Sequence, residues 1–350
     1  MKLRNPASLF MLFLLVFWLI TQFGLAAILE VAAFMGRPIS LMENIWIMSL
    51  VQLFGLLLPL FLWLIITKDS FKRNMPSRPL GAANFALTVV MGVLIIPLAM
   101  FFSAISSLFV TNDVAVMLDS LAAQPWWLMM LVFAVTPGVV EELVFRGYIQ
   151  SNTRGSVTKI VVLNGFLFAM MHLSLHQFGY TFVLGVVFAL MVYYTKNIWA
   201  GIIPHFIMNG VNVTISHWAT GAIANGDALA EELTFAQELY NAFVDFDPAL
   251  AQRAYEWAYD LNVEIFAVVV VGVIALIATA AFAGVFVAFV SHNRKRSKLF
   301  EVAPTEESTE TPQEEPEPKR FRPDWCLIGV VVLYLLVIVS TMWLERLVEV

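Results

Sequence analysis

Long runs of apolar residues recur along the whole chain and determine its expected architecture. A helix needs about 20 mainly apolar residues to cross the hydrocarbon core of a membrane, and open sheets would leave backbone groups without partners in lipid. The expected spans are residues 8–29, 45–67, 84–110, 126–149, 158–175, 178–195, 198–217, 264–290 and 325–344. The pattern predicts an all-α polytopic membrane helix bundle of eight or nine transmembrane helices, because the short fifth to seventh runs leave room for a re-entrant helix.

Composition supports a membrane protein rather than a soluble one. The 350 residues are 60% hydrophobic and 13% charged, with a mean hydropathy of +0.81, whereas soluble domains are roughly 45–50% apolar. The net charge of -6 says little about partners, because the acidic residues gather in two stretches. No segment indicates binding to nucleic acid, so the expected partners are the lipid bilayer and a membrane-associated molecule. The single cysteine, Cys326, excludes a disulfide framework and a thiolate metal cage.

The distribution of Lys and Arg predicts how the helices are oriented. Cytoplasmic loops of membrane proteins collect these residues. With nine helices and a cytoplasmic N-terminus, 16 of the 20 fall on one side, 3 on the other and Arg146 within a span. A missed or additional helix would move every later loop to the other side of the membrane and remove the asymmetry. The distribution of Lys and Arg therefore supports both the number of spans and the orientation. We expect an integral protein of the cell membrane.

Two loops depart from the short connections found elsewhere. Residues 218–263 form an expected acidic extracytoplasmic loop, in which apolar residues at helical spacing predict one or two amphipathic helices. Residues 291–323 are rich in Glu, Thr and Pro in their second half and are expected to form a disordered cytoplasmic linker. The predicted organisation is therefore a membrane domain at 1–290, this linker, and a final transmembrane helix within 324–350.

The fourth span carries three ionisable residues in six positions: Glu141, Glu142 and Arg146. Each ionised group at the centre of a span costs about 2.5–3.5 kcal/mol even on the most permissive scale, so such groups need internal partners or an aqueous cavity. Glu142 and Arg146 are four residues apart in the favourable order for an ion pair within a helix. Glu141 points about 100° away from Glu142 and lacks that partner, which makes it a candidate general base. The alternative is a structural clamp with no catalytic role.

Two later spans carry histidines. His172 lies late in the fifth span, with Phe168 one turn before it, and His205 lies four residues before Asn209 in the seventh span. Counted along the helices, Glu141, His172 and His205 lie at similar depths from the cytoplasmic face, so one cavity open to the cytoplasm is expected to collect them. Such a set could activate water and stabilise an oxyanion, hold one divalent metal ion such as zinc, or act only as hydrogen-bonding contacts between helices. The chain contains no HExxH or GxSxG motif.

In these residues the sequence resembles the CAAX-protease and bacteriocin-processing family, also called the CPBP or Abi family. That family has three motifs on successive hydrophobic segments, Glu-Glu-x-x-x-Arg, Phe-x-x-x-His and His-x-x-x-Asn. They are found here as Glu141-Glu142 to Arg146, Phe168 to His172, and His205 to Asn209. The resemblance covers residues 125–217, and the acidic loop and last two spans have no counterpart in it.

The resemblance implies an intramembrane endopeptidase that uses water rather than a covalent intermediate. Glu141 would be the general base, His172 would position the water, and His205 and Asn209 would stabilise the oxyanion. Glu142, Arg146 and Phe168 would support them. The family has been described both as metalloproteases and as metal-independent glutamate proteases, and Glu141, His172 and His205 would serve as metal ligands in the first scheme. The substrate would be a membrane-associated peptide or protein, such as a prenylated CAAX tail. A non-catalytic immunity or scaffold protein and an ion-coupled transporter are the alternatives.

Overall fold

The computed structural model describes residues 6–36, 45–224, 240–260, 263–298 and 324–348. Over these ranges the chain forms helices and no strand, with one isolated bridge between Ser77 and Asn197. The all-α class predicted from the apolar runs is confirmed. The longer helices are α1 (Pro6–Phe34), α2 (Ile45–Thr67), α4 (Ala82–Leu94), α5 (Ile96–Ser107), α10 (Val157–Met171), α11 (Leu175–Thr195), α12 (Trp199–Ala224), α15 (Val263–Lys298) and α16 (Trp325–Val348).

Each expected span coincides in the described residues with a helix, a pair of helices or, for residues 126–149, a continuous run of short helical segments. Six stretches are long and apolar enough to cross a membrane, and α10 and residues 325–340 are shorter apolar helices. Helix α12 is not among the six, and it carries the polar residues His205, Asn209 and Asn212. The protein is therefore an integral membrane protein with a polytopic helix bundle.

The helix boundaries differ from the expected ones in several places. The third span is divided at Ile95 into α4 and α5, because Pro97 near the start of α5 cannot donate a backbone hydrogen bond. A short helix, α6 (Asp113–Ser120), follows where a loop was expected. In the region of the acidic loop, α12 continues to Ala224 and α14 covers Pro248–Asp260, while residues 225–239 lie outside the described ranges. Helix α15 extends to Lys298, into the expected linker, whose residues 299–323 also lie outside them.

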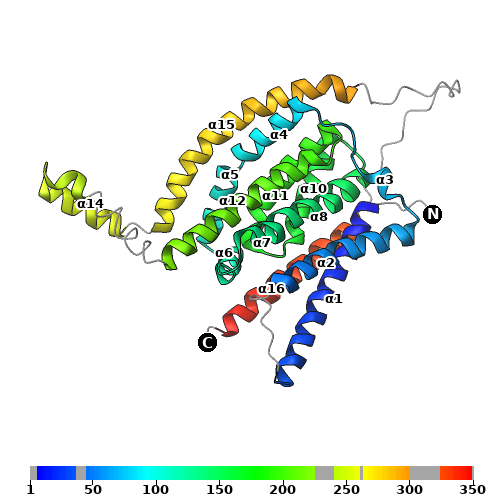
Figure 1. The fold of residues 1–350 in the computed structure, drawn as a ribbon, viewed down its shortest axis with the longest axis horizontal. Coiled ribbons are helices and arrows are strands. Elements are labelled where there is room, and N and C mark those ends of the chain that lie inside the picture. The colour runs from blue at the N-terminus through cyan, green and yellow to red at the C-terminus, as the bar shows by residue number, and fades with distance from the viewer. Residues whose placement is uncertain (1–5, 37–44, 225–239, 261–262, 299–323, 349–350) are drawn as a thin grey trace.

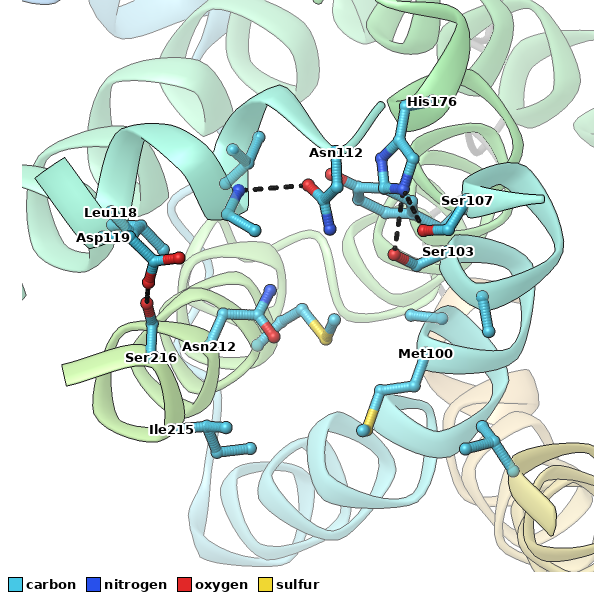
Figure 2. A pocket seen from close by; sticks show the side chains of 17 residues that line it. Met100, Ser103, Ser107, Asn112, Leu118, Asp119, His176, Asn212, Ile215 and Ser216 are labelled. Atoms are coloured by element: carbon cyan, nitrogen blue, oxygen red, sulfur yellow. Dashed lines mark hydrogen bonds between the residues drawn. The ribbon is translucent and has the colours of Figure 1, made fainter. Parts of the chain in front are cut away.

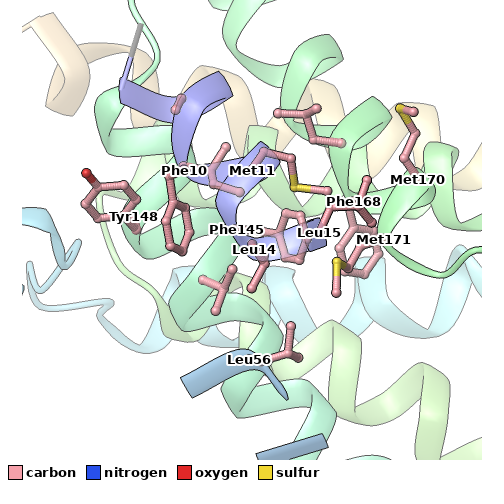
Figure 3. Close-up of a cluster of buried hydrophobic side chains, with 14 of the residues drawn as sticks. Phe10, Met11, Leu14, Leu15, Leu56, Phe145, Tyr148, Phe168, Met170 and Met171 are labelled. Carbon is pink, nitrogen blue, oxygen red and sulfur yellow. The ribbon is translucent and has the colours of Figure 1, made fainter. Parts of the chain in front are cut away.

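The helices form a central group with a smaller group on each side (Figure 1). Helices α10, α11 and α12 lie at the centre with the helical run of residues 126–152. Helices α1, α2 and α16 pack on one side of this centre, and α4, α5 and α15 pack on the other. The largest buried cluster joins α1 and α2 to the central group, and Figure 3 shows Phe10, Met11 and Leu14 of α1 beside Phe145 and Phe168.

The run of residues 126–152 alternates between α- and π-helix. Pro137 has no N–H group and cannot continue a regular α-helix, and the N–H of Thr136 bonds to the carbonyl of Leu131, five residues earlier. π-Helical turns occur frequently at functional sites, and Glu141 and Glu142 lie between the two turns of this run. The segments are α7 (Trp126–Met130), η1 (Leu131–Val135), α8 (Thr136–Glu142), η2 (Leu143–Ile149) and α9 (Gln150–Asn152).

Two glycines allow α10 and α11 to approach closely. A Cβ atom added to Gly165 would lie 2.6 Å from Cγ2 of Val186 and 2.9 Å from the carbonyl oxygen of Phe182, and one added to Gly185 would lie 2.7 Å from Cα of Gly165. Small residues commonly permit this kind of contact between membrane helices. The contact holds α10, which carries Phe168 and ends at His172, against α11.

We predict that Gly165→Ala destabilises the bundle by about 1–3 kcal/mol, the usual cost of overpacking a core. The expected result is a lower midpoint of thermal unfolding in detergent. Gly24→Ala in α1 is the matched control, because no atom lies within 4 Å of its added Cβ. Equal midpoints for the two variants would contradict the close packing of α10 against α11.

Candidate active site

Glu142 and Arg146 form a fully buried ion pair at the centre of the bundle. Nη1 of Arg146 donates to Oε1 of Glu142 at 2.7 Å, and Nη2 donates to the carbonyl oxygen of Gly185 in α11 at 3.0 Å. Both side chains have zero exposure. The guanidinium also lies 4.4 Å from the centre of the Phe168 ring, a distance suited to a cation–π contact. The spacing of four residues thus produces the expected ion pair. Arg146 also connects this pair to α11 through Gly185 and to α10 through Phe168.

The same oxygen of Glu142 contacts His205 from α12. Nδ1 of His205 lies 2.9 Å from Oε1 of Glu142, so Nδ1 donates its proton to the carboxylate. A carboxylate bonded to one ring nitrogen fixes the orientation and the tautomer of a histidine. Nε2 of His205 is then directed toward Glu141, whose Oε2 lies 3.8 Å away. Glu142 therefore links Arg146 to His205.

Glu141 has a different environment from its neighbour. Its side chain is 15% exposed, whereas that of Glu142 is fully buried, and its Oε2 has no hydrogen-bond partner in the described residues. A carboxylate oxygen in this state can accept a hydrogen bond from a water molecule or a substrate. Adjacent glutamates thus occupy two environments: one carboxylate is bonded to protein groups, and the other faces the cavity.

His172 caps the C-terminal end of α10, and its ring is oriented by Phe168. Nδ1 of His172 donates to the carbonyl oxygen of Phe168 at 2.8 Å, which leaves Nε2 free for another partner. The Phe168 ring contacts both histidine rings, with ring centres 4.9 Å from His172 and 5.8 Å from His205. Phe168 thus separates the two imidazoles and contacts Arg146.

The candidate residues line one cavity of about 160 Å³. Glu141, His172, His205 and Asn209 all face it, and we call it the reaction cavity. The structure thus brings together three helices that are far apart in sequence. It also adds residues that the sequence did not single out, including Gln52, Gln177 and Tyr180. Their helices show ordinary apolar patterns, so no short motif could have marked them.

Gly201 keeps space for the buried carboxylate. A Cβ atom at this position of α12 would collide with Oε2 of Glu142. That oxygen has no hydrogen-bond partner in the described residues. The Glu142 side chain therefore fits only because residue 201 has no side chain.

The lining of the reaction cavity comes from different ends of its helices. The N-terminal halves of α2 and α11 and helix α6 contribute to it, and they lie away from the Lys- and Arg-containing segments that follow Thr67 and Thr195. His205 and Asn209 lie in the N-terminal half of α12, which begins shortly after Lys196. The opening of the cavity toward the side of the Lys and Arg residues stays a prediction.

The three side chains considered as metal ligands do not form a ligand set. Among the described residues, no three His, Cys, Asp or Glu side chains gather closely enough to hold a metal ion. Nδ1 of His205 is bonded to Glu142, and Nδ1 of His172 is bonded to a backbone carbonyl, so only Nε2 of each ring is left for a further partner. The chemistry of the site is considered below through these side chains alone.

Comparison with known proteins supports the resemblance found in the motifs. Residues 123–211 match the family model described as "Type II CAAX prenyl endopeptidase Rce1-like". No curated protein and no solved structure matches the chain. The matched segment contains the ion pair, both histidines and Asn209, and it runs from the start of the fourth expected span into α12. Residues 123–211 therefore form an Rce1-like domain, and this match agrees with the resemblance of these residues to the CAAX-protease and bacteriocin-processing family.

Proposed function

We propose that this protein is an intramembrane endopeptidase that hydrolyses a peptide bond of a membrane-associated peptide or protein. A prenylated C-terminal tail belongs to this substrate class. The observation that supports the proposal most directly is the position of Glu141 and His205, whose carboxylate and ring nitrogen lie 3.8 Å apart beside a cavity that His172 and Asn209 also line. A base, imidazole groups and an amide donor are the groups that water-dependent peptide hydrolysis requires.

In the proposed reaction, Glu141 takes a proton from a water molecule whose oxygen attacks the carbonyl carbon of the substrate. Nε2 of His172 accepts a hydrogen bond from the second O–H group of that water, which keeps its hydrogen, and so orients it. The oxyanion that forms is stabilised by the amide of Asn209 and by Nε2–H of His205, whose ring acts in this step as an imidazolium with protons on both nitrogens. Glu141 then passes its proton to the leaving nitrogen, the C–N bond breaks, and the products are a carboxylate and an amine.

Glu142 and Arg146 act in this scheme as positioning residues. Glu142 directs Nε2 of His205 toward the cavity through its bond to Nδ1, and Arg146 balances the charge of Glu142. A charge near the middle of a membrane is stable only with such a partner. The pair therefore supports catalysis without touching the reacting atoms.

We further propose that the N-terminus is cytoplasmic and that the protein resides in the cell membrane. The 16-to-3 distribution of Lys and Arg supports this orientation. With this orientation, three contributors to the lining of the reaction cavity, namely α6 and the N-terminal halves of α2 and α11, lie in the half of the bundle that faces away from the cytoplasm.

We predict that Glu141→Gln lowers the rate of peptide cleavage by at least about 10²–10⁴-fold, the usual contribution of a general base. The measurement is cleavage of a fluorescence-quenched, lipid-anchored peptide by the purified protein in detergent micelles. The unfolding midpoint should remain close to that of the wild type, because Oε2 of Glu141 makes no hydrogen bond in the described residues that the substitution could remove. Full activity in this variant would overturn the proposed function and favour a scaffold or immunity protein.

We predict that Arg146→Leu destabilises the protein by about 3–5 kcal/mol, because it leaves the Glu142 carboxylate buried and unpaired. Arg73→Leu is the matched control: Arg73 also pairs with an acid four residues away, Asp69, but its side chain is 72% exposed. The expected change for this control is about 0–1 kcal/mol. Similar unfolding midpoints in detergent for the two variants would show that the buried pair does not stabilise the bundle.

The orientation can be tested with single cysteines in a Cys326→Ser background. Thr111, just before α6, and Lys72, in α3 (Phe71–Asn74), are both exposed and lie at opposite ends of the bundle. We predict that a membrane-impermeant maleimide labels Thr111→Cys in intact cells and labels Lys72→Cys only after permeabilisation. The reverse pattern would contradict the proposed orientation.

A further inference from the structure

The reaction cavity is too small to contain a peptide substrate by itself. Sites for ligands of drug size usually measure roughly 300–1,000 Å³, and the reaction cavity measures about 160 Å³. Two larger cavities adjoin it. One of about 450 Å³ lies against α1 and α2 and shares Glu141 and His172 with the reaction cavity. The other, of about 420 Å³, lies between α5, α6, α11 and α12 and shares Tyr180 and Asn212 with it. We call them the α1–α2 cavity and the α5–α6 cavity.

A carboxamide lies at the junction with the α1–α2 cavity. Gln52 of α2 lines both this cavity and the reaction cavity. The two other polar side chains of α2, Ser49 and Thr67, donate to carbonyl oxygens of their own helix. The described residues show no hydrogen bond from the Gln52 side chain. A carboxamide without a hydrogen-bond partner is costly in an apolar span. Because Gln52 lines the same cavities as Glu141, its side chain can form hydrogen bonds with a bound substrate.

A second carboxamide lies at the junction with the α5–α6 cavity. Asn212 of α12 lines both that cavity and the reaction cavity, one turn from Asn209, and the described residues show no hydrogen bond from its side chain. Figure 2 shows its amide directed into the α5–α6 cavity. The neighbouring polar groups are already engaged: His176 bonds to Ser107 at 3.0 Å, and Asp119 accepts a bond from Ser216 at 3.2 Å. Asn212 is therefore available to a ligand.

We propose that an extended peptide substrate runs through all three cavities, and that Gln52 and Asn212 bind its backbone on opposite sides of the scissile bond. This inference rests on the proposed function. An extended peptide within a membrane has N–H and C=O groups that need partners, and a carboxamide can donate to one and accept from the other. Gln52 and Asn212 are thus positioning residues, and the substrate class is a peptide with ordered residues on both sides of the cleaved bond.

The test compares two near-isosteric variants, Gln52→Met and Asn212→Leu, on a series of lipid-anchored peptides shortened from either end. With the longest peptide, each variant should raise KM by about 3- to 10-fold, the effect of losing one hydrogen bond. Removing the substrate residues on one side of the scissile bond should abolish the effect of one variant only. Removing those on the other side should abolish the effect of the other variant only.

Ser49→Ala is the control, because it removes a polar group from the same helix whose hydrogen bond is local, and its KM should equal that of the wild type. If a variant fails to fold, KM can instead be measured for the wild-type protein with peptides N-methylated at single backbone positions. Each N-methyl group removes one backbone N–H donor of the substrate. KM should then rise for positions on both sides of the cleaved bond.

The possible results separate the two proposals. Absence of cleavage by the wild type would contradict the proposed function itself. Cleavage with unchanged KM in both variants, or sensitivity confined to one side of the scissile bond, would contradict the inference about Gln52 and Asn212 and leave the proposed function intact.

Discussion

One oxygen of Glu142, buried at the centre of a membrane bundle, accepts hydrogen bonds from both Arg146 and His205. This shared contact joins the fourth expected span to α12, while the second nitrogen of Arg146 joins it to α11. In lipid such a charged group cannot rely on water, so the three helices must pack around it with little freedom. The space left by Gly201 and the close contact of Gly165 with Gly185 follow from the same constraint.

The arrangement gives neighbouring glutamates different roles through their environments alone. Glu142 is enclosed and bonded, whereas Glu141 keeps an oxygen without a protein partner next to a cavity. The π-helical turns on either side of the pair change the direction of side chains relative to a regular α-helix. Nε2 of His205 faces Glu141 only because Nδ1 is held by Glu142, so the buried pair determines the geometry of the reaction cavity.

The sequence predicts some of this architecture and not the rest, for physical reasons. Apolar runs of sufficient length identify the helices, since a continuous apolar segment satisfies its own backbone groups in lipid by forming a helix. The pairing of Glu142 with Arg146 follows from a spacing of four residues, which is a local property of a helix. The contact of Glu142 with His205 joins residues 63 positions apart, and no periodicity reveals it. Helix α6 was missed because eight residues between two spans resemble a loop. The location of the cavities depends on which helices diverge, and counting residues from a helix end cannot reveal this.

If the proposed function is correct, peptide hydrolysis by this membrane protein requires the Glu141 carboxylate. This can be tested by comparing the termini of membrane proteins in cells that carry the wild type with those in cells that carry Glu141→Gln at the same level. We expect that a defined set of new termini, in or next to membrane-embedded segments, appears only with the wild type. Identical termini in the two kinds of cell, with both proteins folded in the membrane, would contradict the proposed function.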